Sequence, residues 1–304
     1  MRKCLLLFSG GLDSILAVKI LKEQKIKIVL ICFKSYFFDC DLAKESAKKL
    51  KLRLKVVDFS KEHLKFVKFP EYGFGSAINP CIDCHLLMLK QARKVMMPGK
   101  IDFIATGDVL GQRPFSQNKK TLLKMEKEAG LSGLVLRPLS AKLLPKTIPE
   151  KNRFVKREKL SAFQGKSRKP QISLAKKFKI KKIPSPAGGC ILTDSEYAKK
   201  LKKLFKKVPD YAGRDARVLK KGRVFWSDDF LITVGRNRKE NKELKNLKVK
   251  KDIILEPENF AGPTILIRGF DKKIKKETIK KGVEFLLNYT KKIPETIKIS
   301  IIAA

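Results

Sequence analysis

Residues 3–14 read KCLLLFSGGLDS, a short apolar run that ends in a glycine-rich turn, and a helix-like stretch follows to about Glu23. The two glycines let backbone amides approach an anion closely. The helix behind them offers unpaired N–H groups and the positive end of its dipole, and the hydroxyls of Ser9 and Ser14 add donors. No Gly-Lys-Ser/Thr follows, so the turn is not a Walker A loop. We therefore expect a phosphate-binding turn rather than a purely structural strand–helix connection.

Strand-like apolar runs recur downstream of this turn, at residues 26–33, 54–59, 103–107 and 133–139. Segments with helical spacing lie between them, at residues 42–50, 84–96 and 118–129. Strands that alternate with helices imply crossover connections and a parallel sheet. The sequence thus predicts an α/β fold, a doubly wound parallel sheet whose ligand crevice lies at the carboxyl ends of the strands.

The pattern changes in the second half of the chain, where lysine clusters recur and short strands replace the alternation. Strand-like runs lie at residues 224–226, 231–234, 253–255 and 264–267, and a helix-like segment follows at residues 275–291. Strands followed by a helix are typical of a small α+β domain. We expect two domains, a nucleotide and sulfur-transfer domain over residues 1–208 and a basic domain over residues 209–304.

The charge of the chain is strongly unbalanced. Its 304 residues include 70 Lys and Arg against 30 Asp and Glu, a net charge of +40. A polyanion is the natural partner for so much charge. A lysine-rich composition of the thermophile type is the alternative, but it should raise Glu together with Lys. The longest apolar runs are too short to span a membrane and no signal peptide precedes them, so we expect a cytoplasmic protein without a membrane partner.

The six cysteines fall into different classes. A reducing cytoplasm argues against a disulfide scaffold, and we expect Cys4 and Cys32, which lie in apolar runs, in the core. Cys81 and Cys84 form a CxxC whose spacing puts both sulfurs on one helix face, and Cys190 follows the stretch PSPAGG, which would expose it on a loop. Three such thiols could hold three irons of a 4Fe–4S cluster. Alternatively, two of them are catalytic, one as a persulfide and one resolving it.

The segment SGGLDS resembles the PP-loop of ATP pyrophosphatases, which adenylate a carbonyl oxygen of their substrate and release pyrophosphate. The strand end ATGD, residues 105–108, resembles the ATGH strand end of tRNA thiouridylases, with Asp108 in place of the histidine. The resemblance implies that the ATP phosphates and Mg²⁺ are held by Ser9, Gly10, Gly11, Asp13 and Ser14, with Asp13 counted among the catalytic residues. It also implies that ATP is contacted by Cys32 and Phe33, which face the adenine, and by Gly107 and Asp108.

The stretch NPCIDC, residues 79–84, resembles the catalytic segment of tRNA-specific 2-thiouridylases. By that resemblance Cys84 carries the sulfur and Cys190 is its catalytic partner. Some members have an acidic residue at the place of Cys81, and the cysteine here resembles the three-cysteine members that depend on a cluster. We therefore expect Cys81, Cys84 and Cys190 to hold a 4Fe–4S cluster, with a persulfide on a thiol pair as the alternative.

Polar residues beside these motifs are candidates for binding the substrate. Gln112 and Arg113 lie in the loop after the fourth strand, where ATP and substrate should meet, and Arg113 could pair with a phosphate. Arg137, at the end of the fifth strand, invites the same interpretation. Arg168 and Lys169 belong to a basic run that we expect to contact the tRNA backbone. The alternative for each is a solvated surface charge.

The stretch VGRNRKENKEL, residues 234–244, resembles the motif of the NFACT-R-type RNA-associated domain, which implies binding to folded RNA. The resemblances together predict a tRNA sulfurtransferase that adenylates a uridine carbonyl oxygen, O2 or O4, and replaces it with sulfur. The expected cofactors are ATP, Mg²⁺ and a 4Fe–4S cluster, and the expected partners are tRNA and a sulfide or persulfide carrier, with a homodimer left open. The alternatives are a persulfide-based thiouridylase without a cluster and a PP-loop ligase acting on a small metabolite.

Overall fold

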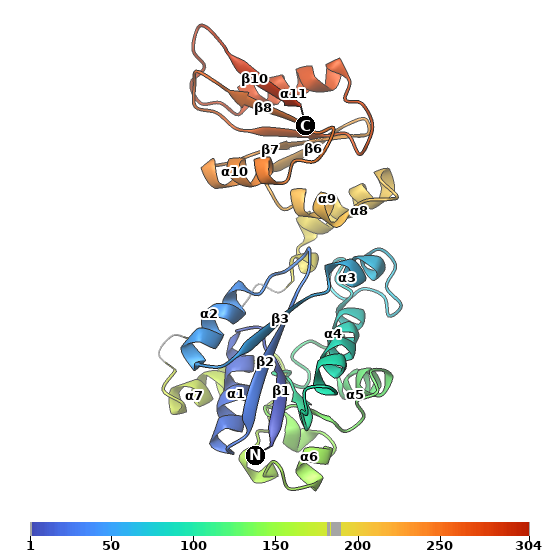
Figure 1. Ribbon diagram of the computed structural model, residues 1–304, viewed down its shortest axis with the longest axis vertical. Coiled ribbons are helices and arrows are strands. Elements are labelled where there is room, and N and C mark those ends of the chain that lie inside the picture. Colours follow the sequence, from blue (N-terminus) through green and yellow to red (C-terminus); the bar gives the residue numbers. More distant parts are fainter. Residues whose placement is uncertain (1, 181–182, 184–189, 304) are drawn as a thin grey trace. The chain divides into compact units, whose positions relative to one another are not determined.

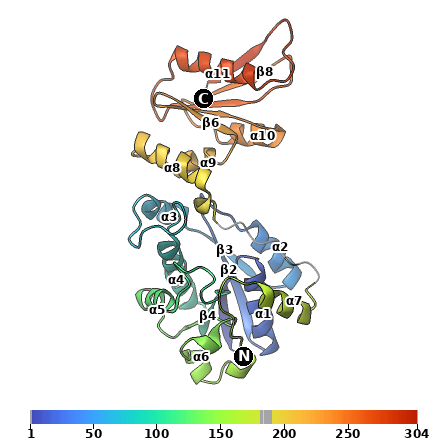
Figure 2. The same cartoon turned by 180° about the vertical axis from the view of Figure 1, so that it is seen from behind.

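The computed structural model describes residues 2–180, 183 and 190–303, and the chain forms two compact units, Met1–Thr193 and Asp194–Ala304 (Figures 1 and 2). The first unit holds the alternating strands and helices, and the second holds an antiparallel sheet. Helix α8 (Ser195–Lys207) belongs to the second unit. The sequence pattern places the boundary between the two domains after residue 208 instead, and that boundary stays a prediction.

The first unit is built on a five-stranded parallel sheet with the order β3-β2-β1-β4-β5. Its strands are β1 (Lys3–Leu7), β2 (Lys27–Lys34), β3 (Leu54–Asp58), β4 (Phe103–Ala105) and β5 (Val135–Leu136). The helices are α1 (Leu12–Glu23), α2 (Asp41–Leu50), α3 (Ser60–Val67), α4 (Cys81–Met96), α5 (Lys119–Glu128), α6 (Ile148–Lys151) and α7 (Lys169–Lys177). The predicted doubly wound parallel sheet is confirmed.

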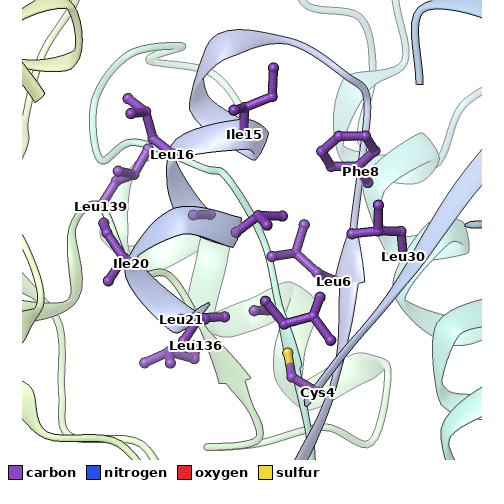
Figure 3. Packing of buried hydrophobic residues seen from close by; sticks show 14 of the residues in the cluster. Cys4, Leu6, Phe8, Ile15, Leu16, Ile20, Leu21, Leu30, Leu136 and Leu139 are labelled. Atoms are coloured by element: carbon purple, nitrogen blue, oxygen red, sulfur yellow. The ribbon is translucent and has the colours of Figure 1, made fainter. Parts of the chain in front are cut away.

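Successive residues of the central strand β1 are buried on opposite faces of the sheet, as the two-residue period of a strand requires. Cys4 and Leu6 pack with Leu16 and Leu21 of α1 in one cluster, which Figure 3 shows. Leu5 points to the other face and joins the cluster beneath α4 and α5. Cys4 is fully buried, which confirms its assignment to the core.

The order of the strands fixes where a ligand can bind. The chain runs from β1 to β2 on one side and returns to β4 on the other, so the direction of winding reverses between β1 and β4. The loops after these two strands diverge to opposite faces and leave a crevice at the carboxyl edge of the sheet. The glycine turn and the stretch ATGD both lie there.

The second unit is an antiparallel sheet with the order β10-β8-β9-β7-β6, which confirms the predicted α+β class. Its strands are β6 (Arg223–Ser227), β7 (Phe230–Val234), β8 (Ile253–Pro257), β9 (Ile265–Arg268) and β10 (Ile299–Ala303), and its helices besides α8 are α9 (Gly213–Val218), α10 (Arg238–Asn246) and α11 (Lys276–Asn288). Helix α11 crosses the sheet closely: a Cβ at Gly282 would lie 2.8 Å from the side chains of Leu255 and Ile267. Within the described ranges of both units, no helix has the length and hydropathy to cross a membrane.

Candidate active site

The glycine turn after β1 is shaped by helix α2. Gly10 has a φ of +79°, and a Cβ on it would lie 2.5 Å from the carbonyl oxygen of Leu42. The Ser46 hydroxyl donates a hydrogen bond of 3.1 Å to the Gly10 carbonyl. Helix α1 begins at Leu12, and in the described chain its N-terminus has no side-chain cap. Its first amides are therefore available to an anion lying over the turn.

The end of β4 touches the first turn of α1. A Cβ on Gly107 would lie 2.7 Å from the backbone nitrogen of Ser14, so no larger residue fits without moving one of the two backbones. Ser14 itself donates a hydrogen bond of 2.8 Å to the Gly11 carbonyl. The structure thereby brings Gly107 and the glycine turn together, as the position between β1 and β4 requires.

Asp108 is the centre of a polar network behind this contact. Its carboxylate accepts hydrogen bonds from Thr106 Oγ1 at 2.7 Å and from Gln117 Nε2 at 3.0 Å, and Arg137 Nε lies 3.6 Å away. Burial acts to raise the pKa of Asp108, but the charges of His85 and Arg137 and these hydrogen bonds outweigh it, so the pKa lies below its ordinary value. Asp108 is therefore an anion at neutral pH.

Arg137 is turned away from any substrate. Its side chain is 2% exposed and forms an ion pair through Nη1 with Glu126, while Nε faces Asp108. A guanidinium held between two carboxylates is a support for Asp108 rather than a free phosphate ligand. The alternative considered for Arg137, a solvated surface charge, does not hold either.

Asp13, in the first turn of α1, faces the loop after β4. Gln112 Nε2 donates a hydrogen bond of 3.2 Å to Asp13 Oδ2, whereas Asp13 Oδ1 is buried and has no hydrogen-bond partner among the described residues. Burial raises the pKa of Asp13, and Gln112 and Arg168 act in the opposite direction. A buried carboxylate oxygen left without a partner suits a hard cation such as Mg²⁺, so the residues present fit that ion.

The three cysteines meet at the start of α4. Pro80 is the N-cap, Cys81 and Cys84 lie in the first turn, and the backbone N–H of Ile78 donates a hydrogen bond of 3.1 Å to Leu192, two residues after Cys190. Burial raises the pKa of the Cys84 thiol well above its ordinary value, and the nearby Cys190 and Cys81 raise it further. The stretch PSPAGG before Cys190 lies outside the described residues.

These thiols do not form a metal-binding set in the structure. Among residues 2–180, 183 and 190–303, no group of three or more His, Cys, Asp or Glu side chains is arranged to hold a metal ion. Burial also raises the pKa of Cys81, although Arg113 acts to lower it. A 4Fe–4S cluster on Cys81, Cys84 and Cys190 stays a prediction, because metal binding itself removes the protons of its thiol ligands.

The end of β2 differs from its sequence prediction. Cys32 is buried, as expected, but it forms a disulfide with Cys40 that the sequence did not predict, their Cα atoms 6.1 Å apart. The loop between them folds back along the end of β2, and the Cys40 sulfur lies 3.3 Å from the Phe33 carbonyl oxygen. The side chains of Cys32 and Phe33 are both buried, 6% and 5% exposed, so they would approach an adenine through their backbone edge.

The four predicted substrate residues separate into two groups. Gln112 and Arg113 are adjacent, yet Gln112 contacts Asp13 while Arg113, which is exposed, acts on Cys81. Arg168 faces Asp13, whereas Lys169 is exposed. Sequence reasoning passed over Gln171, which is fully buried near Asp13; a glutamine inside a lysine-rich run was the one available signal.

Comparison with known proteins finds two family matches. Residues 1–143 match the family described as thiamine biosynthesis protein (ThiI), and residues 222–303 match the NFACT protein RNA binding domain. A tRNA-specific 2-thiouridylase MnmA of Karelsulcia muelleri is 29% identical over 127 residues, covering 38% of this chain and 33% of that protein. The same enzyme of Caldicellulosiruptor saccharolyticus is 28% identical over 229 residues, covering 66% of this chain and 59% of that protein. The chain thus spans from a third to about three-fifths of these relatives.

Two solved structures resemble the chain at a low level. A 4-thiouridine synthetase in complex with RNA and ATP has a TM-score of 0.41 and 23% identity, covering 72% of this chain and 52% of that one. A predicted subunit of tRNA methyltransferase from Methanocaldococcus jannaschii has a TM-score of 0.35 and 19% identity, covering 54% and 93%. The family matches thus cover the two segments that contain the glycine turn and the stretch VGRNRKENKEL, residues 1–143 and 222–303.

Proposed function

We propose that the protein is an ATP-dependent tRNA sulfurtransferase that adenylates a uridine carbonyl oxygen and replaces it with sulfur. One observation carries the proposal. Gln112 donates its hydrogen bond to Asp13 of the glycine turn, and the next residue, Arg113, acts electrostatically on Cys81. Adjacent Cα atoms are about 3.8 Å apart. A single turn of chain therefore contacts both the glycine turn and the thiols. Such proximity is required if the same uridine is first activated by ATP and then receives sulfur.

In the first step the chain binds and orients ATP. The α1 N-terminus and the Ser9 and Ser14 hydroxyls receive the phosphates, and Asp13 is the residue that would hold Mg²⁺. When bound, Mg²⁺ neutralises charge on the phosphates. The uridine oxygen attacks the α-phosphate, and pyrophosphate leaves. A base inside a folded RNA reaches such a crevice only after it is flipped out of its stack.

In the second step sulfur replaces the adenylated oxygen. One of Cys84 and Cys190 carries a persulfide delivered by a donor, and its terminal sulfur attacks the activated carbon, so that AMP leaves. The other thiol then attacks the protein-bound sulfur, which forms a Cys84–Cys190 disulfide and releases the thiouridine. A dithiol reductant restores both thiols. The cluster route would need three thiolates arranged around iron, and we derive no step through it because the described residues lack that arrangement.

The second unit supports RNA as the substrate. Trp226 and Phe270 stack with ring centroids 5.8 Å apart, and Lys207 Nζ lies 5.6 Å from the Trp226 ring. Aromatic faces beside lysines are typical of surfaces that bind nucleic acids by stacking and phosphate contact. The net charge of +40 favours the same class of partner. We place the reaction in the cytoplasm, and a homodimer stays a prediction.

The function is tested by incubating the protein with ATP, a persulfide donor, a dithiol reductant and bulk tRNA, and by measuring AMP together with thiouridine in the digested RNA. We expect both products to depend on tRNA. Cys84→Ser and Cys190→Ser should abolish thiouridine while tRNA-dependent pyrophosphate exchange persists. AMP formation with a small metabolite in the absence of tRNA would favour the ligase alternative.

The two sulfur routes differ in their need for Cys81. On the thiol-pair route, Cys81→Ala retains thiolation and the anaerobic protein contains no iron. On the cluster route, the anaerobic protein contains iron and acid-labile sulfide, and Cys81→Ala, Cys84→Ala and Cys190→Ala each lose them. Iron and sulfide counts on these four proteins decide between the routes.

A further inference from the structure

The strongest unassigned feature of the first unit is the beginning of helix α7. This helix packs on α1, and its Ala175 belongs to the same buried cluster as Leu16 (Figure 1). The segment before it is tied to the loop after β4, because the N–H of Gly165 donates a hydrogen bond of 2.8 Å to the Leu110 carbonyl. The first turn of α7 is thereby held at the carboxyl edge of the sheet, beside the glycine turn.

The charge at this helix end is unusual. Arg168 is the N-cap, Lys169 follows it, and the first turn contains no Asp or Glu. Cations at a helix N-terminus oppose the helix dipole, which favours anions there. Within the described chain no side chain caps the helix. The unpaired backbone amides and the two positive side chains thus create a positive electrostatic potential, which favours binding of a highly charged anion.

A second, independent observation points to a ligand at the same place. Gln171 in the first turn of α7 is 0% exposed, and neither atom of its amide has a hydrogen-bond partner among the described residues. The Gln171 amide lies close enough to the Asp13 carboxyl to act on it as a weak hydrogen-bond donor and lower its pKa, but neither Asp13 Oδ1, which is buried, nor the amide has a well-formed hydrogen bond in the described chain. Buried amides are almost always hydrogen-bonded in folded proteins. Three such atoms side by side indicate a group that is bound there during function.

We infer that Arg168, Gln171 and the first turn of α7 form the second wall of the nucleotide site and bind the β- and γ-phosphates of ATP opposite the glycine turn. The inference rests on the proposed function for the identity of the nucleotide. It reassigns Arg168, which faces Asp13, from tRNA to ATP, and leaves the exposed Lys169 as the tRNA contact. The Gln171 amide can donate to a phosphate oxygen through Nε2 and orient an Mg²⁺-bound water through Oε1.

The test measures binding without turnover. The full-length protein is titrated with α,β-methylene-ATP and Mg²⁺ and, separately, with AMP, and the dissociation constants are compared. Arg168→Ala and Gln171→Met should each weaken binding of the ATP analogue by about tenfold or more, the expected loss of a hydrogen bond to a charged group, and change AMP binding less than about twofold. Lys169→Ala is the matched control and should change neither, while weakening tRNA binding.

The inference is overturned if Arg168→Ala leaves the affinity for the ATP analogue unchanged, or if it weakens AMP and the ATP analogue equally. Because Gln171 is buried, its variant is accepted only if its thermal melt stays cooperative, and the partly exposed Arg168 provides a test that does not depend on it. The proposed function fails separately: wild-type protein that binds the ATP analogue but forms no AMP with tRNA would contradict thiolation and leave this site intact.

Discussion

At the scale of single residues, Gly107 is the tightest constraint on the nucleotide site. We expect Gly107→Ala to destabilise the fold by about 1–3 kcal/mol, because the added Cβ must displace backbone atoms of α1 that lie 2.7 Å away. The displaced amides would also bind phosphate less well. Thermal denaturation and titration with the ATP analogue measure the two effects.

Gly75→Ala is the matched control for this substitution. A Cβ there would meet the side chain of Phe115 at 3.0 Å, and Phe115 is exposed and can move. We expect near-wild-type stability and affinity. Equal behaviour of the two variants would show that the contact between β4 and α1 does not constrain the site.

His63 gives a second prediction at this scale. It is 1% exposed, neither ring nitrogen has a partner among the residues described, and burial lowers its pKa to about 3. The aromatic rings around it are those of Phe37, Phe38, Phe59 and Phe66. In the unfolded chain its pKa is about 6.5, so the unfolded state binds a proton between pH 3 and 6.5 that the folded state does not. Stability therefore falls as the pH is lowered through this window.

Between pH 7.5 and pH 5, His63 alone should lower the free energy of unfolding by about 2 kcal/mol. In His63→Phe this part of the pH dependence should disappear. Urea denaturation of both proteins at the two pH values measures the difference. Parallel losses in wild type and variant would mean that His63 is protonated in the folded protein.

The residues of the site were predictable to the extent that their chemistry is local. The SGGLDS turn could be predicted from the sequence, because two glycines and two hydroxyls between a strand and a helix are typical of a phosphate-binding turn. The roles of Arg137 and Gln171 could not be predicted, since they depend on Glu126 and Asp13, which only the folded chain brings near. The sequence around the exposed Arg113 does not distinguish it from an ordinary surface arginine. Only its position near Cys81 in the folded chain does so.

At the scale of elements, the Cys32–Cys40 disulfide links β2 to α2. Helix α2 follows Cys40 directly and packs against Gly10, like a floor beneath it, through the Leu42 backbone and the Ser46 hydroxyl. Opening the disulfide should lower the free energy of unfolding by about 2 kcal/mol and loosen that floor. A phosphine reductant should therefore shift the wild-type urea midpoint downward and weaken binding of the ATP analogue.

Cys40→Ser provides the comparison for the reductant. It should reproduce the reduced wild type and show no further response to reductant. If wild type and Cys40→Ser have the same midpoint without reductant, the disulfide does not stabilise the unit.

Elements whose pattern is local were predicted, and elements made by distant pairing were not. The predicted strands at residues 224–226, 231–234 and 253–255 fall within β6, β7 and β8, and the one at residues 264–267 is shifted by one residue from β9. Strand β10 was missed, because its five residues become a strand only by pairing with β8, more than forty residues earlier in the chain. Helix α4 begins at Cys81 rather than Cys84, as Pro80 at its N-cap allows.

At the scale of the whole molecule, we expect the net charge to govern the affinity for RNA. With a net charge of +40 and several phosphate contacts, binding to bulk tRNA should weaken by about 10³-fold between 50 and 200 mM salt. Binding of the ATP analogue should change far less, because it involves one small ligand in a crevice. Filter binding and calorimetry across that range measure both. A tRNA affinity that is independent of salt would exclude the charge as its origin.

One turn of chain at the end of β4 contacts two parts of the candidate site, since Gln112 donates a hydrogen bond to Asp13 and Arg113 acts electrostatically on Cys81. On the proposed function, we expect a substitution in that turn to change both ATP activation and sulfur transfer. Survey mutagenesis that scores only ATP consumption would misclassify its variants as simple nucleotide defects. On the proposed function, paired substitutions of Gln112 and Arg113 should therefore be more informative than single ones for changing the nucleobase that the protein accepts.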